Sequence, residues 1–181
     1  MSLDNYFANF QRISTPSQEV INDLIRLKEI LVRIKDRSAK VFIVGNGGSS
    51  AIASHVSVDF TKAAGLTCWN FSDPSLLTCF ANDYGYENWV KEAINAYGDA
   101  GDALIVISSS GESKNIINAC RAARDKEFAS VATFTGFNSG NSVRKWGDLN
   151  FWVDSTTYNM VENTHQLWLL SIVDSIAGVE S

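Results

Sequence analysis

Apolar residues along the chain follow two spacings, one typical of helices and one typical of buried strands. Residues 17–37 carry apolar side chains three or four positions apart, which predicts a helix with one broad apolar face. The runs KVFIVG at 40–45 and ALIVIS at 103–108 show no polar alternation, which predicts strands covered on both faces. Further strands are predicted at 67–71, 129–136 and 148–153.

Helical stretches separate these strands. They are predicted at 49–65, at 74–98 with a break near 82–85, at 113–126, at 140–146 and at about 158–178. Strands that alternate with helices form βαβ units, so the pattern predicts an α/β fold around a parallel sheet. No repeat or linker interrupts it. We therefore expect one domain over residues 1–181, with N-terminal helices at about 3–37 and an α/β core at about 38–181.

Composition narrows the class of protein. The 181 residues are 45% hydrophobic and 19% charged, an ordinary globular balance, and the formal net charge of -5 argues against nucleic acid as the main partner. Cys68, Cys79 and Cys120 form no CxxC pair, which suggests reduced thiols. The sequence shows neither a secretory signal nor a run of about 18 apolar residues. We expect a cytoplasmic protein with no membrane partner.

Two corners rich in small polar residues follow the two most apolar strands. GNGGSS occupies 45–50 and SSSGES occupies 108–113. Ligands of open parallel sheets bind at the carboxyl ends of strands, where helix N-termini and glycine backbone favour phosphate. Serine and glycine are also common in caps and turns, but two such corners in one sheet favour a phosphate site. Neither corner matches a dinucleotide fingerprint or a P-loop.

The segments VGNGGSSAIASH at 44–55 and ISSSGESKNIINA at 107–119 resemble the sugar isomerase (SIS) domain family, and more narrowly its phosphoheptose isomerase group. The resemblance extends over nearly the whole chain. It implies a three-layer αβα fold with a five-stranded parallel sheet of the flavodoxin-like, doubly wound type. It also implies a homotetramer that interconverts sedoheptulose 7-phosphate and an aldose heptose 7-phosphate. In a lone domain the apolar stripe of 17–37 would cover the sheet, but we expect it to pack against a neighbour's equivalent helix in such an oligomer.

The resemblance also assigns binding residues. The phosphate would be held by Ser108, Ser109, Ser110 and Ser113, and the sugar would be lined by Asn46, Gly47, Gly48 and Ser49. Asn82 and Asp83 match a family pair that reaches the same pocket, although such a pair also commonly ends a helix. One or two aromatic residues could shape the pocket, among Trp69, Phe71, Tyr84, Tyr86, Trp89 and Tyr158, while most of them are expected in the core or in oligomer contacts.

An aldose–ketose isomerase moves a proton between adjacent carbons through an enediol, and it needs a base and usually a second acid–base group. His55 and Asp59 are four residues apart on a predicted helix and share one face. By the resemblance, Asp59 stands at the position of the catalytic glutamate, one methylene shorter. His55 stands at a position that binds metal or substrate.

The segment YNMVENTHQLWLL at 158–170 departs from the family pattern. Glu162 stands at a glutamine position and Leu170 at the catalytic histidine position, while His165 matches a different histidine. Glu162 and His165 are three apart and could form a replacement acid–base pair. Alternatively, Glu162 pairs on the helix surface and His165 lies at a subunit contact.

No cofactor is required by this hypothesis. A divalent metal such as zinc could bind His55, Asp59 and Glu162, with His165 as a further ligand. Three functions stay open: an isomerase of a sugar phosphate such as sedoheptulose 7-phosphate, an isomerase of a different phosphosugar, and a non-catalytic regulator or adaptor that binds a sugar phosphate. Leu170 favours the last of these, and the departures at Asp59 and Leu170 also fit the second.

Overall fold

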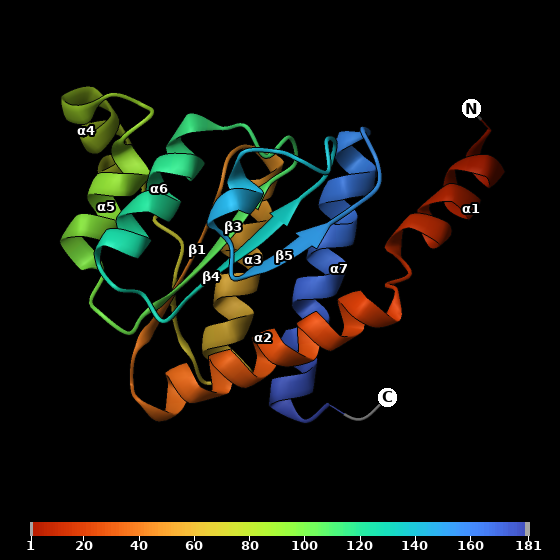
Figure 1. The fold of residues 1–181 in the computed structure, drawn as a ribbon, viewed down its shortest axis with the longest axis horizontal. Coiled ribbons are helices and arrows are strands. Elements are labelled where there is room, and N and C mark those ends of the chain that lie inside the picture. The colour runs from red at the N-terminus through yellow and green to blue at the C-terminus, as the bar shows by residue number, and fades with distance from the viewer. Residues whose placement is uncertain (1, 180–181) are drawn as a thin grey trace.

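A parallel sheet between two layers of helices forms the body of the computed structural model, which describes residues 2–179 (Figure 1). Its five strands lie in the order β2-β1-β3-β4-β5, and all neighbouring pairs are parallel. The strands are β1 (Lys40–Gly45), β2 (Thr67–Trp69), β3 (Ala103–Ser108), β4 (Ser130–Thr135) and β5 (Leu149–Trp152). This order confirms the predicted doubly wound, flavodoxin-like α/β fold.

Helices cover both faces of this sheet. They are α1 (Leu3–Ser14), α2 (Gln18–Asp36), α3 (Gly48–Lys62), α4 (Pro74–Tyr84), α5 (Trp89–Tyr97), α6 (Lys114–Asp125), the 3-10 helix η1 (Val143–Trp146) and α7 (Tyr158–Ala177). One core joins the sheet to α2, α3 and α7, and the other joins it to α5, α6 and η1. None of the helices between residues 2 and 179 has the length and apolar content of a membrane-spanning segment.

The apolar stripe of α2 is buried within the chain. Leu27, Leu31 and Ile34 belong to the core that contains α3 and α7. The expectation that this stripe packs against a neighbouring subunit was therefore wrong for these three residues. By contrast, α1 extends away from the sheet in Figure 1, and its Leu3 and Phe7 side chains are 74% and 64% exposed.

Two turns set the limits of predicted elements. β2 ends at Trp69, earlier than expected, because Phe71 has a positive φ of 56° and the Asn70 side chain accepts a hydrogen bond from the Ser72 amide at 2.9 Å. The predicted break in the 74–98 helix is confirmed. Gly85 has a φ of 81°, which ends α4 and allows α5 to begin four residues later.

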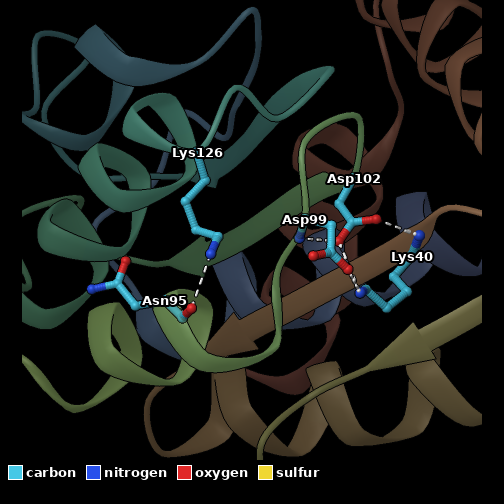
Figure 2. A network of polar contacts seen from close by, with 5 residues as sticks. All are labelled: Lys40, Asn95, Asp99, Asp102 and Lys126. Carbon is cyan, nitrogen blue, oxygen red and sulfur yellow. Dashed lines mark hydrogen bonds and ion pairs between the residues drawn. The ribbon is translucent and has the colours of Figure 1, made fainter.

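A charged network fixes the amino ends of the central strands (Figure 2). Asp102 is 2% exposed and accepts hydrogen bonds from the backbone amides of Lys40 at 2.7 Å and Asp99 at 2.8 Å. The Lys40 ammonium lies between both carboxylates, and nearby Lys126 donates to the Asn95 carbonyl at 2.9 Å. These contacts tie β1 to β3 at the edge of the sheet opposite the two glycine- and serine-rich corners.

Candidate functional site

The first corner follows β1 and leads directly into α3. Gly47 adopts a φ of 55° and stands at the N-cap position of α3. A Cβ on Gly48 would lie 2.3 Å from Oε2 of Glu162, so only glycine leaves room for that carboxylate. The amides at the start of α3 therefore lie beside Glu162, which comes from the distant helix α7.

The second corner follows β3 and leads into α6. Gly111, with a φ of 67°, donates its amide to the Ser108 carbonyl at 2.9 Å and closes a tight turn. Ser113 stands at the N-cap position of α6, yet its side chain makes no capping hydrogen bond. Its hydroxyl lies 3.5 Å from that of Ser108. These hydroxyls thus gather at a helix N-terminus without being used to cap it.

Ser109 carries an unusual hydroxyl at this corner. The residue is 5% exposed, and its Oγ has no hydrogen-bond partner within residues 2–179. A buried hydroxyl without a partner is unfavourable, so such atoms are rare in folded proteins unless a ligand or another group completes them. Ser109 is also one of the residues that line a cavity.

The two corners enclose a cavity of about 360 Å³. It lies at the carboxyl ends of β1 and β3, where α3 and α6 leave toward opposite faces of the sheet, the usual ligand position in such folds. The lining residues are Asn46, Gly47, Gly48, Ser49, Ile107, Ser108, Ser109, Ser110, Ser113, Tyr158 and Glu162. This lining contains hydroxyls, amides and one carboxylate, but neither lysine nor arginine. An anion would therefore be bound by hydrogen bonds and helix N-termini.

Glu162 forms the wall between this cavity and a second one of about 320 Å³. Partial burial raises the pKa of the Glu162 carboxyl above its ordinary value. The second cavity is lined by Gly48, Ala51, Ile52, His55, Glu162, Asn163 and Gln166. The two cavities share Gly48 and Glu162, so an elongated ligand in the first cavity would reach the second past the carboxylate.

His55 is held at both ring nitrogens in the second cavity. Its Nε2 lies 3.2 Å from Oδ2 of Asp59, as their spacing on one helix face predicted, and its Nδ1 lies 3.0 Å from Nε2 of Gln166. With the Gln166 amide donating to Nδ1, the ring proton lies on Nε2 and points at Asp59. Asp59 lines neither cavity and contacts the site through His55.

His165 lies in the core. It is fully buried, its Nε2 lies 3.1 Å from the Thr135 carbonyl oxygen, and its ring packs edge-on against Phe134. Burial lowers the pKa of His165 to about 4. It lines neither cavity, so the predicted acid–base pair with Glu162 is not formed. Leu170 packs against the same core.

Two other predicted groups do not come together at these cavities. Asn82 and Asp83 lie near the end of α4, with exposed side chains that hydrogen-bond to each other at 2.9 Å, and neither lines the two cavities. Within residues 2–179, no three His, Cys, Asp or Glu side chains gather as a metal site. His55, Asp59 and Glu162 are therefore not gathered as the zinc ligand set that was predicted.

Two polar side chains without a predicted role complete the site. Asn115, on α6, hydrogen-bonds to Asn46, and Gln166 contacts His55. Asn115 lies inside the segment ISSSGESKNIINA at 107–119, two residues after Ser113, which was a signal for its position. Among the six aromatic candidates, Tyr158 lines the first cavity and Tyr86 donates to Asn46.

Comparisons with known proteins agree with this geometry. The family model described as SIS domain matches residues 5–136. The phosphoheptose isomerase of Fusobacterium nucleatum is 33% identical over 159 residues, covering 85% of this chain and 81% of that protein. That of Burkholderia pseudomallei is 32% identical over 176 residues, covering 90% and 86%. The solved structure of a phosphoheptose isomerase from Neisseria gonorrhoeae is 28% identical, covers 98% of this chain and 97% of that one, and has a TM-score of 0.87.

Proposed function

The chain belongs to the SIS domain family, and we propose that it is a sugar-phosphate isomerase that interconverts an aldose and a ketose. One observation carries the proposal: an anion site built from hydroxyls and helix N-termini shares a cavity with a carboxylate, Glu162, whose pKa burial raises. A phosphosugar fits both features, because its phosphate anchors one end while its carbon chain passes the acid–base group. The curated relatives named phosphoheptose isomerase support the same reaction class.

The phosphate is bound at the second corner. Ser108, Ser109, Ser110 and Ser113 provide the hydroxyls, and the backbone at the start of α6 provides amide donors. The cavity lining contains no lysine or arginine that could form an ion pair with the phosphate. The contacts to the phosphate are therefore directional hydrogen bonds. The hydroxyl of Ser109, which has no partner within residues 2–179, is satisfied when it donates a hydrogen bond to a phosphate oxygen.

Glu162 is the proposed base. Its carboxylate removes a proton from the carbon next to the carbonyl, which gives an enediol, and then returns the proton to the adjacent carbon. The raised pKa of its carboxyl makes both steps easier near neutral pH, because accepting and releasing a proton become better matched. His55, oriented by Asp59 and Gln166, is proposed to move the second proton between the two oxygens.

We propose a heptose phosphate such as sedoheptulose 7-phosphate as the substrate, since the relatives carry the name phosphoheptose isomerase. We also propose a homotetramer in the cytoplasm. The exposed Leu3 and Phe7 side chains on α1 would be covered in an oligomer. The three free cysteines are compatible with a reducing compartment. Light scattering of the purified protein would test the tetramer.

The isomerase proposal is tested by incubating the purified protein with sedoheptulose 7-phosphate and following the aldose by proton NMR. Glu162→Gln keeps the shape of the side chain but removes the base, so turnover should fall by about a hundredfold or more while binding persists. Glu29→Gln, on the exposed side of α2, is the matched control and should keep the full rate. Equal rates in both variants would remove Glu162 from the reaction. A folded wild-type protein that converts no phosphosugar in a panel would refute the proposal.

A further inference from the structure

Asn46 lies at the first corner and is bonded to the second one. Its Nδ2 donates to Oδ1 of Asn115 at 3.0 Å, and Nδ2 of Asn115 donates back to Oδ1 of Asn46 at 2.8 Å. Asn115 is only 2% exposed, so this reciprocal pair is shielded from water on the side of α6. The pair fixes the plane of the Asn46 amide and joins the two corners that form the cavity.

A third group contacts the same amide. The Tyr86 hydroxyl, from the turn between α4 and α5, donates to Oδ1 of Asn46 at 3.0 Å. The turn is itself held against α6, because Asn118 donates to the Glu87 carbonyl at 2.9 Å. Asn118 lies three residues after Asn115, on the same side of that helix. One side of α6 therefore holds both partners of Asn46.

These contacts determine what Asn46 offers a ligand. A carboxamide oxygen accepts two hydrogen bonds, and those of Asn46 are both taken, one from Asn115 and one from Tyr86. Its nitrogen carries two protons, of which one is used in bonding Asn115. Within the described residues the second N–H has no hydrogen-bond acceptor, and Asn46 lines the cavity. The side chain is thus a donor, with no free acceptor.

We propose that Asn115 and Tyr86 are positioning residues, which hold the Asn46 amide so that its free N–H binds an oxygen of the sugar part of the substrate. This inference rests on the proposed function. In the structure the Tyr86 hydroxyl donates to Oδ1 of Asn46, which leaves the second N–H of the amide to the ligand. Without the Tyr86 hydroxyl the Asn46 amide loses one of the three hydrogen bonds that hold it, so its N–H is less firmly placed.

The test removes only the hydroxyl. Tyr86→Phe should weaken binding of sedoheptulose 7-phosphate by about three- to tenfold, the effect of one neutral hydrogen bond. Inorganic phosphate, which needs the serine corner alone, should bind within about twofold of its wild-type affinity. Tyr84→Phe is the matched control, because Tyr84 lies two residues away across Gly85, is about as exposed as Tyr86 (52% against 54%), and its hydroxyl makes no hydrogen bond within residues 2–179. It should change neither affinity.

A double-mutant cycle separates positioning from a general structural effect. In an Asn46→Ala background, Tyr86→Phe should have no further effect on sugar-phosphate affinity, because the hydroxyl acts through Asn46. Asn115→Ala should give a loss at least as large as Tyr86→Phe. Asn115 is buried and its replacement can impair folding, so the result for the exposed Tyr86 decides the test.

Three outcomes overturn the inference. The first is equal sugar-phosphate affinity in wild type and Tyr86→Phe, with the wild type binding well, which leaves the proposed function intact. The second is an equal loss for inorganic phosphate, which would place the contact at the phosphate group. The third is an additive effect in the Asn46→Ala background. If the wild-type protein binds no phosphosugar at all, the proposed function itself fails, and this inference with it.

Discussion

Replacing Ser109 with alanine should leave the free protein at least as stable as the wild type. The substitution removes one oxygen that is buried and has no hydrogen-bond partner in the described residues. A buried polar group without a partner costs about 1–3 kcal/mol, so its removal offsets the small loss of packing. Urea unfolding without ligand measures this difference in the free energy of unfolding.

The same substitution should weaken binding. In the proposed complex the hydroxyl of Ser109 donates to a phosphate oxygen, and a hydrogen bond to a charged group contributes about 1.5–3 kcal/mol. At about 1.4 kcal/mol per factor of ten, the affinity for a sugar phosphate should fall by about ten- to a hundredfold. Isothermal titration with sedoheptulose 7-phosphate measures the loss. Stability and affinity therefore move in opposite directions, which a purely structural serine would not produce.

Ser130→Ala is the matched control for Ser109→Ala. Ser130 is 2% exposed, and its hydroxyl also lacks a hydrogen-bond partner among residues 2–179. It lies at the amino end of β4, at the opposite edge of the sheet from the cavity. It should show a similar effect on unfolding and no change in affinity. The reasoning is refuted if Ser109→Ala destabilises the free protein while its affinity stays at the wild-type value.

Three further predictions concern other groups. Gly48→Ala places a Cβ 2.3 Å from Oε2 of Glu162, so it should displace that carboxylate and lower kcat at least tenfold, measured with the aldose assay. His165 has a pKa of about 4 in the folded protein against an ordinary value near 6.5. Its contribution to the free energy of unfolding is therefore complete above pH ~6.5 and is lost as the pH falls toward 4. In thermal unfolding scans His165→Gln should flatten that pH dependence. Asp102→Ala leaves two backbone amides without their acceptor and should lower the free energy of unfolding by about 2–4 kcal/mol in urea, with kcat unchanged.

Each of these has a clear contrary result. An unchanged kcat in Gly48→Ala would show that the position of the Glu162 carboxylate does not matter. A pH dependence equal to that of the wild type in His165→Gln would assign the acid sensitivity to other groups. A fully stable Asp102→Ala protein would mean that the network at the amino ends of β1 and β3 is replaced by water at little cost.

The apolar strands and both corners follow from local sequence patterns, whereas the arrangement of the five strands was expected only from the family resemblance. β1 and β3 are apolar throughout because both faces are covered by helices, so their runs are recognisable without any partner information. The glycines and serines that follow them mark the carboxyl edge of the sheet for the same local reason. The cavity between the two corners is lined by every residue that the family resemblance assigned to those corners.

The errors arise where the packing of one helix decides which side chain meets the cavity. Glu162 and His165 are three residues apart on α7, yet one lines the cavity and the other is fully buried. His165 is in phase with Val161, Leu169 and Ile172, which are all core residues, and this 4-4-3 spacing was the available signal. The contacts of Asn115 and Gln166 join segments far apart in the sequence, and no local pattern predicts such pairs.

The most direct test of the account is solvent exchange at the reacting carbon. The purified protein is incubated with sedoheptulose 7-phosphate in D₂O, and deuterium next to the carbonyl is followed by proton NMR. The account predicts deuterium at that carbon with the wild-type protein and its loss in Glu162→Gln, because the enediol forms only when the carboxylate removes the proton. Exchange that persists in Glu162→Gln, or a folded wild-type protein that binds the sugar phosphate without exchange, would contradict it.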